Sequence, residues 1–133
     1  MSAAIRVPVH PPGGWTDKLT YCAAVRAGKL LFVSGMTASR PDGSVAGKGD
    51  MAAQARYIYM DKLLPLLRSA GAGFEHVVET VDYVTTFEGY ARTADVRREV
   101  FGGAPYPAAT GVQVAGLVRA DALIEIRATA VLP

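Results

Sequence analysis

Residues 123–131 constrain the fold of this chain more than any other segment. They read Leu-Ile-Glu-Ile-Arg-Ala-Thr-Ala-Val, and the alternation of apolar and polar residues predicts a strand with one buried face. Glu125 falls in the middle of this strand, on the face opposite Ile124 and Ile126. Because an unpaired buried charge is very costly, its carboxylate is expected to face a cleft, a partner subunit or water. Glu125 is therefore the leading candidate for chemistry.

Composition narrows the class of protein. A chain of 133 residues, half of them hydrophobic and 20% charged, predicts one globular domain spanning residues 1–133. A scattered formal charge of +2 argues against a nucleic-acid surface, and the apolar stretches are too short to span a membrane. Without a signal core at the N-terminus, a cytoplasmic location is the default. A single cysteine, Cys22, and two histidines, His10 and His76, predict neither a disulfide nor a metal site.

The order of predicted elements indicates the fold class. Prolines and glycines predict an irregular N-terminal arm over residues 1–18. Beyond it we expect strands at 21–26, 29–34, 77–86, 109–114 and 123–131, and helices at 50–70 and 88–101. The first two strands meet in a tight turn at Ala27-Gly28, Asp50 caps the first helix, Gly71 stops it, and Pro65 kinks it. This order predicts an α+β sandwich with two helices on one sheet face. The second face is also rich in apolar residues, so we expect a homo-oligomer that buries it.

Several runs resemble the Rid (YjgF) family, in the right order over roughly residues 19–132. They are residues 21–35, residues 50–56, Ala70-Gly71-Ala72, residues 77–80, Pro107-Ala108-x-Thr110, Val112-x-Val114 and Ile124-Glu125-Ile126-x-Ala128. The resemblance implies a mixed sheet in a chorismate-mutase-like fold and a homotrimer with three clefts between subunits. It also implies hydrolysis of reactive enamines and imines, such as 2-aminoacrylate, without a cofactor.

The resemblance also implies roles for two positions. An arginine after the Pro-Ala grips the substrate carboxylate, and the glutamate matching Glu125 handles the water or proton. Here the arginine position is Ala109, and Gly111 stands where the family often has Cys or Thr. Further departures are Ala94 in place of an Asn, and about one extra residue around positions 57–60 together with Pro65.

The missing arginine limits which substrates fit. No alanine can replace the bidentate pair that a guanidinium makes with a carboxylate. Losing such charged hydrogen bonds, worth roughly 1.5–3 kcal/mol each, weakens binding about a hundredfold or more. A standard 2-aminoacrylate deaminase is therefore not expected. Arg127 shares the strand face of Glu125 and is the best-placed substitute cation, ahead of Arg97 and Arg119.

Each candidate site residue has a structural alternative. Glu125 is either a general acid/base or half of a salt bridge, with Arg127 or with an arginine of another subunit. Tyr21 either orients substrate or water in the cleft, or is an ordinary edge-strand aromatic residue. Thr110 and Gly111 offer a hydroxyl and a backbone N–H to an oxyanion, unless Gly111 only relieves crowding. Trp15 flanks the cleft or simply packs.

Gly35 and Met36, which directly follow the predicted strand at 29–34, complete the candidate substrate-binding residues. With this set, a Rid-type hydrolase acting on a C–N bond of a small metabolite is the preferred hypothesis. The alternative is a non-catalytic trimer that binds a small ligand or a partner enzyme in the same clefts. The charge distribution gives no support to an endoribonuclease.

Overall fold

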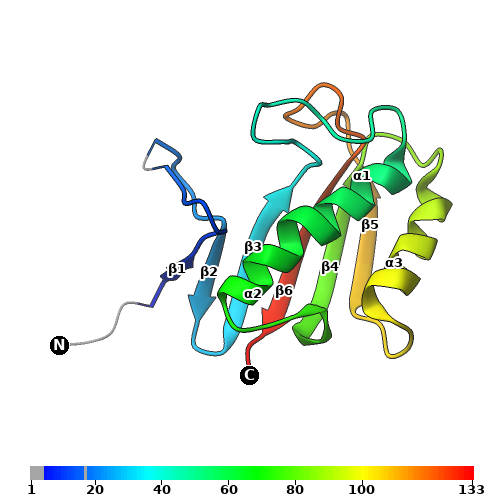
Figure 1. Ribbon diagram of the computed structural model, residues 1–133. Coiled ribbons are helices and arrows are strands. Elements are labelled where there is room, and N and C mark those ends of the chain that lie inside the picture. The colour runs from blue at the N-terminus through cyan, green and yellow to red at the C-terminus, as the bar shows by residue number, and fades with distance from the viewer. Residues whose placement is uncertain (1–4, 17) are drawn as a thin grey trace.

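The computed structural model describes residues 5–16 and 18–133, in which six strands form one sheet with helices on one face (Figure 1). The strand order is β1-β2-β3-β6-β4-β5, and only β4 and β5 run parallel. The predicted α+β fold with a mixed sheet is confirmed. The elements are β1 Val7–Val9, β2 Ala24–Ala27, β3 Leu30–Met36, α1 Met51–Tyr57, η1 Ile58–Leu63, α2 Leu64–Ser69, η2 Phe74–His76, β4 Val77–Val84, η3 Tyr90–Arg92, α3 Thr93–Phe101, β5 Ala108–Gln113 and β6 Ile124–Val131.

The N-terminal arm departs from the prediction. The expectation of an irregular segment over residues 1–18 is wrong for Val7–Val9, which form the edge strand β1 against β2. Pro8 is tolerated there because an edge strand leaves one row of N–H groups unused. Residues 1–4 and 17 of the arm lie outside the described residues.

The β2–β3 hairpin is present, with its turn one residue later than predicted. Ala27 pairs with Leu30, so the turn residues are Gly28 and Lys29. Gly28 has φ +62°, as the first central position of a type II′ turn requires. The strand of the hairpin that was expected from residue 21 begins only at Ala24.

The first helix begins and ends as predicted but carries a π-helical turn in its middle. Asp50 caps it by accepting a hydrogen bond from the Ala53 N–H, and Gly71 follows its end with φ +75°. Between α1 and α2 the chain forms the π-helix η1, in the region where the resemblance implies about one extra residue. Pro65 lies in the first turn of α2, next to this π-helix.

The alternation in β6 separates the two sheet faces as predicted. Ile124, Ile126, Ala128 and Ala130 are buried under the helices, whereas the residues between them are partly or fully exposed. We call these two sides the helix face and the open face. On the open face Phe32 is 46% exposed and pairs with Thr129, and Leu30 pairs with Val131, both of them exposed. The open face of a single chain thus keeps uncovered apolar side chains.

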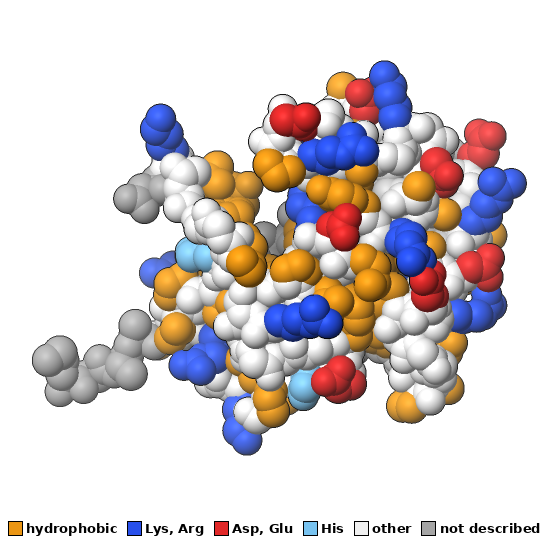
Figure 2. All heavy atoms as spheres, viewed as in Figure 1, with side chains coloured by type: hydrophobic (Ala, Val, Ile, Leu, Met, Phe, Trp, Pro, Cys, Tyr) orange, Lys and Arg blue, Asp and Glu red, His pale blue; other side chains and the backbone are white. Residues whose placement is uncertain are grey.

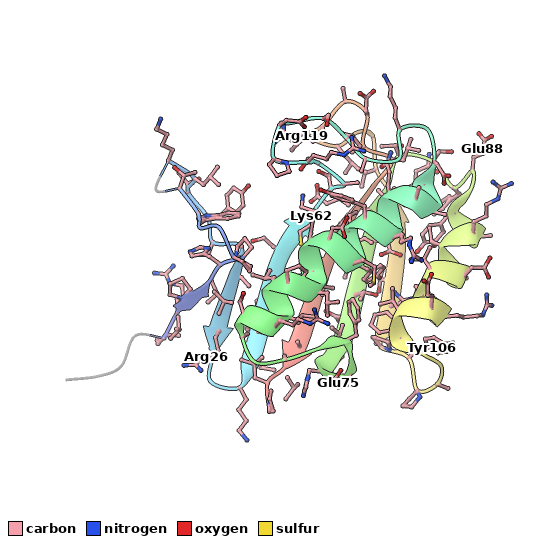
Figure 3. The ribbon with its side chains drawn as sticks, viewed as in Figure 1. Arg26, Lys62, Glu75, Glu88, Tyr106 and Arg119 are labelled. Atoms are coloured by element: carbon pink, nitrogen blue, oxygen red, sulfur yellow. The ribbon has the colours of Figure 1, made fainter. Side chains whose placement is uncertain are left out.

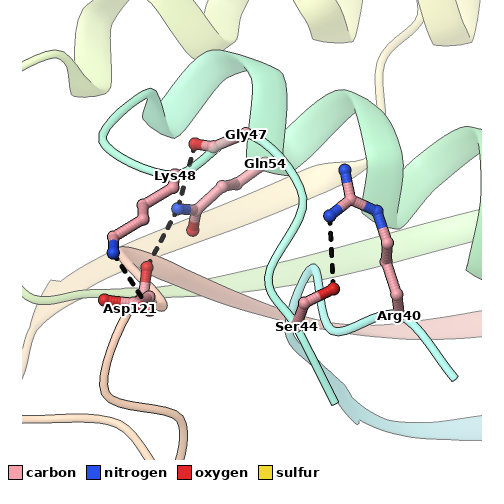
Figure 4. A network of polar contacts seen from close by, with 6 residues as sticks. All are labelled: Arg40, Ser44, Gly47, Lys48, Gln54 and Asp121. Atoms are coloured by element: carbon pink, nitrogen blue, oxygen red, sulfur yellow. Dashed lines mark hydrogen bonds and ion pairs between the residues drawn. The ribbon is translucent and has the colours of Figure 1, made fainter. Parts of the chain in front are cut away.

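A buried glutamine fixes the long loops above the sheet. Gln54 is fully buried; its amide donates to the Gly47 and Asp121 carbonyls and accepts from the Leu123 N–H (Figure 4). Lys48 makes an ion pair with Asp121 beside this network. Because these bonds join α1 to the segment before β6, they position the loop that leads to the candidate site. No helix among the described residues is long and apolar enough to cross a membrane.

Candidate functional site

A pocket of about 330 Å³ lies on the open face around Glu125. Three elements of the sheet form it: β6 supplies Glu125, β4 supplies its pair partner Tyr83, and β3 supplies Gly35. The register between β3 and β6 shifts between Val33 and Met36, so the strands are irregularly paired beside the pocket. The full lining is Gly35, Tyr83, Val114, Gly116, Leu117, Val118, Glu125 and Arg127.

The Glu125 side chain needs the glycine opposite it. A Cβ atom at Gly35 would overlap the Glu125 carboxylate, so only glycine lets the side chain lie across β3. Glu125 is half-buried, and it forms no ion pair with any residue in the described part of the chain. The salt bridge to Arg127 that the sequence left open is thus not formed within one chain.

Arg127 and Thr110 share the open face with Glu125. Arg127 is exposed and lines the same pocket. Val81 of β4 pairs with Arg127 on one side and with Thr110 on the other, which places these side chains on one face. The structure therefore brings three predicted site residues, Glu125, Arg127 and Gly35, into one pocket, whereas Thr110 shares their face without lining the pocket.

Ala109 and Gly111 lie on the helix face instead. Because alternate residues of a strand point to opposite sides, Ala109 pairs with the fully buried Thr80 and Gly111 with the buried Asp82. In a single chain these two positions are thus separated from Glu125 by the sheet.

A polar cluster on the helix face meets these two positions. The Tyr90 hydroxyl donates to Asp82 Oδ2 at 2.7 Å, and Arg97 Nη1 donates to Thr80 Oγ1 at 2.8 Å. Asp82 is only 3% exposed, and this burial raises the pKa of its carboxyl. Asp82 and Tyr90 were not among the site residues predicted from the sequence. Asp82 could have been found from the sequence, because a carboxylate in the largely apolar strand 77–84 needs a polar partner, just as Glu125 does in its strand.

The remaining candidates do not line the pocket. Trp15 donates from Nε1 to the Tyr21 carbonyl at 2.9 Å, and the two rings meet edge to face. Tyr21 is 54% exposed, before β2 begins. Met36 pairs with Ile126 and packs against the core. In a single chain, Tyr21 and Trp15 form an aromatic pair of their own.

Lys62 holds the loop that follows β3. Its ammonium group donates to the Thr37 carbonyl at 2.7 Å and to both oxygens of Ser39 at 3.1 and 3.0 Å (Figure 3). Burial, with a smaller effect of Arg119, lowers the pKa of Lys62. Arg119, a suggested substitute cation, lies in the loop between β5 and β6 and does not line the pocket.

A second hollow, of about 560 Å³, lies in the helix layer. Apolar and charged side chains mix over this face of the molecule (Figure 2). The lining residues are Met60, Leu64, Arg68, Ala72, Gly73, Phe74, Glu75, Glu99 and Val100.

Substitution of Gly111 by alanine is expected to destabilise the protein. The added Cβ would overlap the Tyr90 hydroxyl, and overpacking of this kind costs about 1–3 kcal/mol. Urea unfolding should show the loss for Gly111→Ala and little change for Gly116→Ala, where a Cβ meets open space. Adding Tyr90→Leu to Gly111→Ala should recover part of the loss. Equal stability of the two alanine variants would contradict the packing of Tyr90 against Gly111.

Comparison with known proteins agrees with this architecture. The family model described as Endoribonuclease L-PSP matches residues 16–132. The chain is 36% identical over 114 residues to the RutC family protein YjgH of Escherichia coli K12, covering 85% of this chain and 83% of the relative. It is 38% identical over 107 residues to Protein DfrA of Myxococcus xanthus, covering 80% and 79%.

Solved structures give the same result. The structure of Protein YJGH superposes with a TM-score of 0.83 at 34% identity, covering 98% of both chains. A Mycobacterium tuberculosis member of the YjgF/YER057c/UK114 family has a TM-score of 0.78 at 31% identity, covering 96% of this chain and 99% of the other. The chain belongs to the Endoribonuclease L-PSP family, which is the Rid/YjgF/RutC family that its sequence resembles.

Proposed function

We propose that this protein is a cofactor-independent hydrolase of an imine, an enamine or a related C–N bond in a small metabolite, with Glu125 as general acid/base. The observation that carries the proposal is the Glu125 carboxylate itself. It lines the open-face pocket against Gly35 and has no ion-pair partner among residues 5–16 and 18–133. Family membership and the resemblance of the 124–128 segment support it.

One carboxylate suffices for the chemistry. Water adds to the C=N carbon of the protonated imine, and Glu125 takes the proton that the water loses. The resulting neutral carbinolamine carries a hydroxyl and an amino group on one carbon. Glu125 then gives its proton to the amino nitrogen. As the C–N bond breaks and ammonia leaves, the carboxylate takes the hydroxyl proton, which yields the carbonyl product. An enamine first accepts a proton on carbon and then follows the same route. This use of one group as base and then acid is ordinary general acid–base catalysis.

The substrate is not expected to be 2-aminoacrylate. Ala109 stands where the resemblance implies a carboxylate-binding arginine, and it lies on the helix face rather than in the Glu125 pocket. Arg127 is the cation that lines this pocket within the described residues. A larger or differently anchored substrate fits this arrangement better.

An imine-trapping assay tests the proposed function. An amino-acid oxidase generates imines of many sizes, and semicarbazide traps those that persist. The protein should lower trapping of at least one larger imine, while activity on 2-aminoacrylate stays weak or absent. Rapid turnover of 2-aminoacrylate would show that another cation binds the substrate carboxylate in place of the missing arginine. Failure to lower the trapping of any imine would contradict the hydrolase.

The chain is also expected to form a homotrimer. The open face keeps Phe32, Leu30 and Val131 exposed, and burial of apolar surface against symmetry mates would stabilise an oligomer. Light scattering should give three times the chain mass of 14.0 kDa. A monomer mass at micromolar concentration would contradict both the trimer and the clefts between subunits.

Ala109 and Gly111 favour a second candidate, a non-catalytic trimer that binds a small molecule or a partner enzyme in the same clefts. Such a protein would bind its ligand without accelerating imine hydrolysis. The trapping assay distinguishes the two functions.

A further inference from the structure

The hydroxyl of Tyr90 occupies the side-chain space of Gly111 on an exposed strand. We propose that Tyr90 is a further ligand-binding residue, whose hydroxyl oxygen, backed by Asp82, accepts a hydrogen bond from an N–H group of the ligand at the edge of β5. This inference rests on the proposed hydrolase, because imines and enamines carry such a nitrogen.

The Tyr90 hydroxyl lies where a side chain at position 111 would otherwise be. A Cβ atom at Gly111 would overlap the Tyr90 oxygen, so the tyrosine supplies the polar atom that position 111 lacks. β5 is exposed along its whole length, and β4 is its only partner strand among the described residues. Tyr90 therefore reaches from the helix layer and places its hydroxyl beside the edge strand β5.

The hydrogen bond of Tyr90 decides what the hydroxyl can bind. Its proton is donated to Asp82 Oδ2 at 2.7 Å, so its lone pairs are left to accept a hydrogen bond. Burial first, and then the Asp82 carboxylate, raises the pKa of Tyr90, which keeps the phenol neutral. A ligand group that donates, such as N–H, is the complement of this arrangement.

Asp82 provides the second, independent observation. The residue is only 3% exposed, and its Oδ1 has no hydrogen-bond partner among residues 5–16 and 18–133. Buried carboxylate oxygens normally find a donor. The cluster is thus short of a donor among the described residues, which favours a ligand group that donates a hydrogen bond.

Arg97 supports the same cluster from the helix layer. Its Nη1 bonds the hydroxyl oxygens of Thr80, the pair partner of Ala109, at 2.8 Å and of Tyr59 at 3.0 Å. Tyr59 and Thr80 are almost fully buried, so this guanidinium braces the core side of the cluster. Oxamate, a stable planar amide that carries an N–H group, is a suitable probe for the Tyr90 hydroxyl, and pyruvate is its analogue without N–H.

Tyr90 and Glu125 lie on opposite faces of one sheet. Asp82 pairs with the core residue Ile126, whereas Tyr83 pairs with Glu125. A single ligand can contact both groups only where the β5 edge of one subunit meets the open face of another. The proposed site is therefore incomplete without a second copy of the chain.

Calorimetric binding of oxamate and pyruvate tests the inference. Tyr90→Phe removes one hydrogen bond and should weaken oxamate binding about tenfold, with pyruvate changing by less than about twofold. Tyr106→Phe is the matched control, because Tyr106 is exposed in the loop after α3 (Figure 3). It should bind both probes as the unmodified protein does.

Three results would overturn the assignment of Tyr90. They are equal weakening of both probes by Tyr90→Phe, no weakening of either, and no binding of oxamate to the unmodified protein. These binding data do not depend on turnover. If the protein is inactive but keeps the Tyr90-dependent preference for oxamate, the proposed hydrolase is contradicted and the Tyr90 site is supported. If the protein is active but lacks that preference, the hydrolase is supported and the Tyr90 site is contradicted.

Discussion

Glu125→Gln is expected to lower kcat for imine hydrolysis by about 10²–10⁴-fold, the usual contribution of a positioned general acid/base. Glutamine keeps the size and the hydrogen-bonding shape of the side chain, but it cannot take a proton from water or return one to nitrogen. Because no ion pair within the described residues depends on Glu125, its replacement should leave the fold and the oligomer intact.

The control for this variant is Glu88→Gln, at an exposed residue between β4 and η3 that does not line the pocket (Figure 3). Its rate should match that of the unmodified protein. Light scattering and urea unfolding of both variants separate chemistry from structure. Full activity of Glu125→Gln would mean that the glutamate is structural.

Gly35→Val is expected to lower kcat/KM about a hundredfold or more. Its Cβ would overlap the Glu125 carboxylate, and displacement of a catalytic group by about 1 Å can cost that much. The side chain of Glu125 must rotate away, while the surrounding sheet can remain paired.

Gly116→Ala is the matched control for the glycine variant. Gly116 lines the same pocket, and a Cβ there meets no atom within 4 Å. Activity of this variant should fall far less. If Gly35→Val retained normal kcat/KM, Glu125 would not need its present position, and the pocket would not be the site of hydrolysis.

Local patterns predicted the elements that position Glu125. The period of two in residues 123–131 assigned Glu125 and Ile126 to opposite faces, and both are found there. Asp50 and Gly71 mark the ends of the first helix because capping and positive φ depend on the nearest residues. Such features need no knowledge of distant partners.

Features that depend on pairing between strands were harder to predict from the sequence. Consecutive residues of β5 point to opposite faces, so the motif Ala109-Thr110-Gly111 could not by itself show that only Thr110 shares the face of Glu125. Val7–Val9 is a strand only because β2 offers it an edge. The contact between Tyr90 and Gly111 joins residues from different layers, and a one-dimensional pattern carries no sign of it.

A crystal structure with the carbonyl product of an imine that the protein hydrolyses in the trapping assay tests the central claim most directly. We expect the ligand to bind in the pocket lined by Glu125, with its oxo group within about 2.6–3.2 Å of the carboxylate or one water away. The reacting carbon would then lie where Glu125 can move protons. A ligand bound instead in the hollow of the helix layer, or with its oxo group turned away from Glu125, would contradict the account.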